Sequence, residues 1–176
     1  MLSMVVVTPL VIRLAGNGEY GSFTFAMSVF SMLLIFTTPG IFDGVRKYLS
    51  EDRSDPNWHE NVLVFYFGFG SVLAFTVAVI LSLFAYSGFL TPYFDDSIID
   101  LFYLIAILLL AEQAIFILRG AHMGLGNEFH SELLLFIRSL FFVLSSVGLV
   151  YIGFGAEGIL AGRILGSIVA AAAGLF

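Results

Sequence analysis

Ionisable residues inside long apolar runs are the residues of this sequence best suited to chemistry. Three of them, Glu112, Arg138 and Arg163, lie within such runs. A charge in a bilayer is costly and by default faces protein or a water-filled cavity. An arginine there can grip a phosphate or carboxylate through its planar fork of donors. A glutamate can pair with the arginine or couple to an ion. The three residues therefore indicate anion binding or charge pairing within a membrane.

The spacing of these charges predicts one contact. Glu112 lies six residues before Leu118, where one apolar run ends, and Arg138 lies seven residues after Ser131, where the next begins. At about 1.5 Å per residue, both lie about 10 Å inside the same face of a helical hairpin. We expect them to pair, either as a structural ion pair or as the lining of a polar cavity. Arg163 lies about two turns inside the opposite face with no evident partner, so it faces a cavity or snorkels to the interface.

A second group of charges, Arg13, Asp43, Arg46 and Lys47, lies at the ends of apolar runs. They are interfacial charges that set the topology, or else gate residues and anion ligands at the mouths of a central cavity. Arg13 and Arg46 join Arg138 and Arg163 as candidate anion contacts. Asp43 joins Glu112 as a candidate for pairing or ion coupling.

Two features of the backbone indicate where helices bend or pack closely. Pro39 and Gly40 interrupt an apolar run, so they form either a hinge for a conformational cycle or a helix stop. Small residues recur at every fourth position of the last run: Gly158, Gly162, Gly166, Ala170 and Gly174. Such a ladder predicts close approach between helices in lipid.

The elements that position these residues must be membrane helices. The chain of 176 residues is 60% hydrophobic and 11% charged, with a mean hydropathy of +1.04. Soluble domains carry about 45–50% apolar and about 25% charged residues, so a soluble fold is excluded. Five runs reach the length of a membrane span, about 20 residues: 20–42, 61–86, 98–118, 131–152 and 158–176. The sequence predicts an all-α integral membrane bundle of about six transmembrane helices.

The two ends of the chain predict a part of a longer protein. Residues 1–12 are apolar but too short to span, and they lack the basic start of a secretory signal. We therefore interpret them as the distal part of a first helix. The chain also ends at Phe176 inside an apolar run. We expect residues 1–176 to form one lobe of a multi-pass protein, lacking the front of helix 1 and a second lobe.

Basic residues predict the orientation of the bundle. Arg46, Lys47 and Arg53 lie in the loop predicted at 43–60, and Arg119 lies in the fourth connection. Because Lys and Arg gather on the cytoplasmic side, we expect these two loops inside and the others outside, with Arg13 as an exception.

Several classes of function are disfavoured. The chain has no Cys, and its three His and few remaining polar residues form no recognisable nucleophile, metal or nucleotide motif. A net charge of −6 disfavours a nucleic-acid partner. We expect no enzyme activity and no cofactor. The acidic excess beside a single lysine, Lys47, suggests a cell adapted to high salt, where charges are screened.

Four stretches together resemble the polysaccharide-biosynthesis flippases, a branch of the multidrug, oligosaccharidyl-lipid and polysaccharide exporter superfamily. TPLVIRLAGNGEYGSFTFAMS, with Arg13 and Tyr20-Gly21, resembles the first helix end, the loop and the second helix start. GIFDGVRKYLSED is similar to the end of the second helix. ILRGAHMGLGNEFHSELLLFIRSL resembles the hairpin of helices four and five, and GAEGILAGRILGSIVAAAAG the sixth helix.

The resemblance implies one lobe of a two-lobed transporter in the cell membrane. Such transporters move lipid-linked oligosaccharides to the outer leaflet by alternating access, without a bound cofactor and driven by ion gradients or the membrane potential. Headgroup phosphates would meet the four candidate arginines between the lobes, while the lipid tail stays among membrane lipids.

Two other interpretations stay open. A multidrug or cation exporter of the same superfamily would favour carboxylates inside the helices, whereas here arginines outnumber the one glutamate. An inactive fragment or a non-transporting membrane scaffold would also fit the apolar helices and the two chain ends.

Overall fold

The computed structural model describes residues 12–175. Its helices are α2 (Asn17–Thr37), α3 (Ile41–Leu49), α4 (Trp58–Tyr86), α5 (Asp96–Gly124), α6 (Glu128–Tyr151) and α7 (Gly155–Ala173). Residues 12–15 are helical as well. The short first segment predicted at 1–12 lies outside the described residues except for Ile12.

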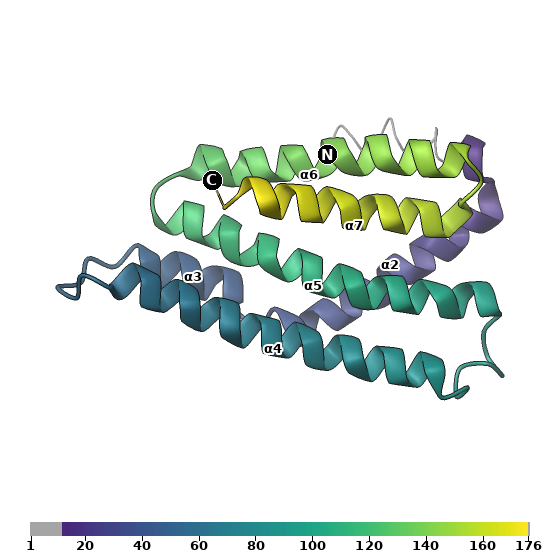
Figure 1. Ribbon diagram of the computed structural model, residues 1–176, viewed down its shortest axis with the longest axis horizontal. Coiled ribbons are helices and arrows are strands. Elements are labelled where there is room, and N and C mark those ends of the chain that lie inside the picture. Colours follow the sequence, from purple (N-terminus) through teal and green to yellow (C-terminus); the bar gives the residue numbers. More distant parts are fainter. Residues whose placement is uncertain (1–11, 176) are drawn as a thin grey trace.

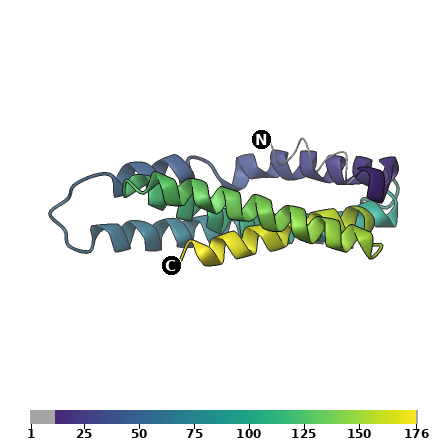
Figure 2. The same cartoon turned by 90° about the horizontal axis from the view of Figure 1, so that it is seen from above.

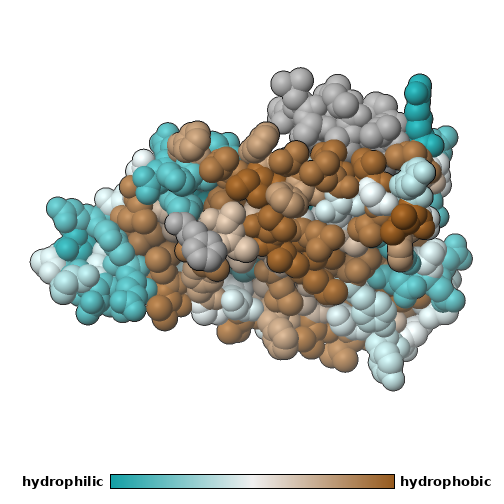
Figure 3. Space-filling model, turned by 45° about the horizontal axis from the view of Figure 1, so that its top comes forward, coloured by the Kyte–Doolittle hydropathy of each residue, from teal (hydrophilic) through white to brown (hydrophobic). Residues whose placement is uncertain are grey.

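The described chain is a multi-pass membrane protein. Five of its helices, α2 and α4 to α7, are long and apolar enough to cross a bilayer, which confirms the five predicted runs of span length. They run along the long axis of the molecule, and their connections alternate between its two ends (Figures 1 and 2). On the face shown in Figure 3, apolar residues cover the middle and hydrophilic residues gather at both ends. This is the surface that a bilayer requires.

The predicted run 20–42 is not one helix. It breaks at Pro39 and Gly40, where α2 has ended at Thr37 and α3 begins at Ile41. Gly40 adopts a left-handed conformation with φ of 66°, which glycine accepts without steric cost. Pro39 offers no backbone N–H to continue the ladder. The break confirms the helix stop, and a hinge function stays a prediction.

The prediction of a loop over 43–60 is wrong for its first part, which is helix α3. Ile41, Val45 and Leu49 recur at intervals of four residues and are buried. This apolar stripe packs on α5, and α5 presents glycine at the contact. A Cβ on Gly120 would lie 2.9 Å from the Phe42 carbonyl oxygen. The outer face of α3 is polar and carries Asp43, Arg46 and Lys47. These closely spaced charges led to the prediction of a loop, although they belong to a short amphipathic helix.

Helix α5 is the centre of the bundle and contacts α2, α3, α4, α6 and α7. It extends beyond the predicted 98–118 to Gly124, because Arg119 does not end it. The Arg119 guanidinium lies 3.3 Å from a Glu132 carboxylate oxygen of α6 and 5.4 Å from the centroid of the Phe42 ring. These contacts accommodate the charge without ending the helix.

The small-residue ladder packs as predicted. Helices α6 and α7 form the most extensive contact in the bundle. Gly158 lies against Leu149, and Gly162 lies against Ser146. A Cβ on Gly166 would lie only 2.9 Å from the backbone nitrogen of Phe142. The glycines therefore allow the two backbones to approach closely.

Candidate functional site

The intramembrane charges meet in one place, which we call the Glu112 cluster: Glu112 of α5, Arg138 of α6, and Arg163 and Ser167 of α7. Arg138 donates to Glu112 Oε2 at 2.7 Å. Arg163 lies 3.4 Å from Glu112 Oε1, which also accepts the Ser167 hydroxyl at 3.0 Å. The predicted contact between Glu112 and Arg138 is therefore confirmed. Arg163, which had no evident partner in the sequence, shares the same carboxylate.

The cluster lies deeper than the apolar runs predicted. Because α5 continues to Gly124 and α6 starts at Glu128, Glu112 is about 18 Å from the end of its helix and Arg138 about 15 Å from the start of its own. Arg163 is about 12 Å from the start of α7, at the other end of the bundle. All three charges therefore lie near the middle of their helices, and a hydrocarbon core about 30 Å thick that is centred on these helices places them near mid-depth.

The charges of the cluster do not balance. Two guanidinium groups share one carboxylate, and within residues 12–175 no other Asp or Glu lies within 4.0 Å of either arginine. Residues 1–11 contain no Asp or Glu. The Glu112 side chain is 2% exposed, whereas those of Arg138 and Arg163 are 23% and 17% exposed. One excess positive charge thus lies at mid-depth, with the arginines closer to the surface than the glutamate.

Arg163 has donor capacity that Glu112 does not use. Its Nε is buried and has no hydrogen-bond partner in the described part of the chain. Its guanidinium lies 5.8 Å from the centroid of the Phe30 ring on α2, within the range of a cation–π contact. An arginine with a free donor and an excess charge is suited to an additional anionic oxygen.

The other predicted site residues lie away from this cluster. Arg46 and Asp43 are exposed on α3, whose Arg46 carbonyl faces Gly124 at one end of α5. Arg13 is exposed in the short helical segment 12–15 that precedes α2, and α2 starts at the opposite end of the bundle (Figure 1). The ion pairs of residues 12–175 include none of these three. The four candidate arginines therefore occupy both ends and the middle of the bundle.

Two polar contacts were missed by sequence reasoning. Ser167 follows Arg163 by four residues, so both lie on one face of α7, and that spacing could have suggested a shared partner. Glu19 of α2 accepts a hydrogen bond from the backbone N–H of Ala156 at 2.7 Å, at the start of α7. A carboxylate is favourable at a helix N-terminus, but a partner so distant in sequence leaves no local signal.

The histidines form a contact that their spacing did not predict. The His122 and His130 rings stack with centroids 5.6 Å apart, and His122 Nε2 lies 3.3 Å from the Gly174 carbonyl oxygen. Among the described residues, no group of three or more His, Cys, Asp or Glu side chains is arranged to hold a metal.

Comparison with known proteins identifies no family. No family model, no curated protein and no solved structure matches the chain. The fold establishes that the described chain is a multi-pass bundle of helices with five apolar spans.

Proposed function

We propose that this chain is the N-terminal lobe of a transporter that moves lipid-linked oligosaccharides across the cell membrane by alternating access. The observation that carries the proposal is the excess positive charge of the Glu112 cluster near mid-depth. An uncompensated cation there is costly, so a bound anion is the natural counterpart. The phosphate or diphosphate of a lipid-linked sugar supplies that anion, and the resemblance of the four sequence stretches points to the same substrate.

The arginines define stages of the movement in this proposal. Arg46 receives the phosphate at one end, the Glu112 cluster holds it at mid-depth, and Arg13 meets it at the other end. The sugars lie between this lobe and a second lobe, and the lipid tail remains in the bilayer. No covalent step occurs, so the transporter works by binding its substrate differently in its inward-open and outward-open states. The break at Pro39 and Gly40 is the candidate hinge.

Flipping by the full-length protein in proteoliposomes tests the proposal. A fluorescent lipid-linked oligosaccharide in the outer leaflet is bleached by a membrane-impermeant reductant, which reports its movement. We expect Arg138→Gln and Arg163→Gln each to slow flipping about tenfold or more, because a charge-assisted contact is worth about 1.5–3 kcal/mol. Each variant leaves Glu112 paired with one arginine, so the bundle keeps its neutral pair.

The matched control is Arg53→Gln, which removes the same charge from an exposed ion pair with Glu51 outside the spans. It should leave flipping unchanged. Normal flipping by both cluster variants would remove the cluster from the substrate path. A wild-type protein that moves no lipid-linked oligosaccharide would overturn the function itself and favour a cation exporter or a non-transporting scaffold.

A further inference from the structure

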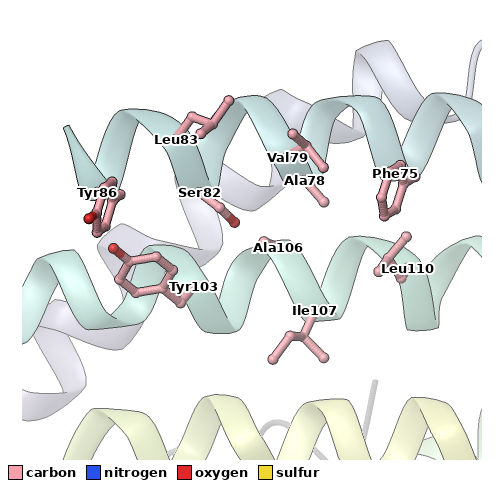
Figure 4. Close-up of a pocket in the computed structure, with 10 residues that line it drawn as sticks. All are labelled: Phe75, Ala78, Val79, Ser82, Leu83, Tyr86, Tyr103, Ala106, Ile107 and Leu110. Carbon is pink, nitrogen blue, oxygen red and sulfur yellow. The ribbon is translucent and has the colours of Figure 1, made fainter.

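An apolar groove between α4 and α5 lies on a different side of α5 from the Glu112 cluster. It has a volume of about 420 Å³. Figure 4 shows its lining side chains, which come from these two helices alone, among them Phe75, Ala78, Leu83 and Tyr86 of α4 and Tyr103, Ala106 and Ile107 of α5. The proposed transport mechanism makes no use of this groove.

The shape of the groove fits a single hydrocarbon chain better than a helix. Its floor is formed by Ala78 and Ala106, which are 5% and 6% exposed. Its rims carry large exposed side chains, among them Phe75, Leu83 and Ile107. Helices associate in lipid through small residues at the outer surface, where backbones can meet. Here the small residues lie below the rims, so an approaching helix could not reach them, whereas an acyl chain could.

One end of the groove is polar. Tyr86 and Tyr103 lie at this end, with their hydroxyl groups turned toward the space between the helices (Figure 4). Asp96 and Asp100 continue the face of α5 that carries Tyr103, at intervals of four and three residues. Both carboxylates are exposed, and residues 87–99 contain no Lys or Arg. Along the groove toward the membrane surface, the exposed groups thus change from apolar side chains to tyrosine hydroxyl groups and then to carboxylates.

We propose that this groove holds one acyl chain of a phospholipid whose headgroup carries an amine. The chain lies over Ala78 and Ala106, and the hydroxyl groups of Tyr86 and Tyr103 donate to the phosphate or ester oxygens. The carboxylates of Asp96 and Asp100 attract the ammonium group. An anionic headgroup without an amine is disfavoured because the same carboxylates repel it.

Quenching of a single tryptophan by brominated lipids tests this assignment in bilayers containing the full-length protein. The chain has one tryptophan, so a Trp58→Phe background leaves none in this chain. Leu83→Trp then reports on the groove. Phe84→Trp is the matched control, because it lies at nearly the same depth, one residue further along α4, does not line the groove and is also exposed. Brominated phosphatidylethanolamine is compared with brominated phosphatidylglycerol at equal low mole fractions.

For Leu83→Trp we expect the amine-headed lipid to compete for the groove about threefold to fivefold better at low ionic strength. The preference should shrink in high salt and disappear in the Asp96→Asn, Asp100→Asn variant. Ala106→Phe, which fills the floor, should reduce quenching to the level at Phe84→Trp. Equal quenching by the two lipids would overturn the headgroup assignment. A groove reporter that neither lipid quenches would show that protein covers the groove and would overturn the proposal.

Discussion

Glu112 carries the negative charge that compensates the arginines of the Glu112 cluster. It is the one carboxylate within 4.0 Å of Arg138 and Arg163 in the described chain, and both of its oxygens are used. The arginines are in excess, so the three residues are not equivalent. Loss of either arginine leaves a neutral pair, whereas loss of the glutamate charge leaves two cations without an anion at mid-depth.

This asymmetry predicts unequal effects on stability. Glu112→Gln should lower the free energy of unfolding by about 3–5 kcal/mol, the cost of leaving a buried charge unpaired. Arg138→Gln should cost only about 1 kcal/mol, because Glu112 keeps Arg163 and Ser167. Thermal unfolding of the purified variants in one detergent compares the two. Equal losses, or a larger loss for Arg138→Gln, would show that the charges of the cluster are balanced by a group outside it.

At the scale of the elements, the contact between α6 and α7 determines the geometry of the cluster. Gly166 of α7 lies against the backbone of α6 between Arg138 and Phe142, so the same close approach brings Arg138 and Arg163 to one carboxylate. A side chain at this position would separate the helices that carry the two arginines.

Gly166→Ala should therefore destabilise the bundle by about 1–3 kcal/mol through overpacking. The melting temperature should fall by about 2–4 °C per kcal/mol for a chain of this size. Gly148→Ala is the control, because it lies in the same hairpin and its added Cβ would meet no atom within 4 Å. A melting temperature that falls equally in both variants would contradict the close contact at Gly166.

Apolar runs with few charges predicted the five spans and the pairing of Glu112 with Arg138, since consecutive helices form hairpins. They did not predict the end of α5, because Arg119 binds Glu132 of α6 and the helix continues past this charge to Gly124. The pairing of Arg163 with Glu112 was missed for a different reason. It depends on the packing of α7 against α5, and the order of helices in space is not encoded in the period of one run.

The connections between the helices of the whole molecule gather at its two ends. The α3–α4 and α5–α6 connections lie at one end, and the α4–α5 and α6–α7 connections lie at the other (Figure 1). The loops predicted to share a side of the membrane thus share an end of the bundle. Which end faces the cytoplasm stays a prediction from Lys and Arg.

Because the chain contains no Cys, single cysteines can report the orientation directly. We expect Thr91→Cys, in the α4–α5 connection, to react with a membrane-impermeant thiol reagent on intact cells. Ser54→Cys, in the α3–α4 connection, should react only after the membrane is permeabilised. Both positions are exposed, so access alone distinguishes them. The reverse labelling pattern would place the basic loop outside and contradict the predicted orientation.

The order of helices in the Glu112 cluster also has a consequence for synthesis. The chain emerges from its N-terminus, so α5 brings Glu112 into the membrane before either arginine exists. Its carboxylate has no arginine partner until α6 delivers Arg138, and the cluster is then neutral. Only α7, the last of these helices, adds Arg163, and the backbone N–H of Ala156 at its start donates a hydrogen bond to Glu19 of α2. During biosynthesis the charge of this site therefore passes from negative through neutral to positive, and the excess positive charge on which the proposed anion binding depends exists only after α7 has packed.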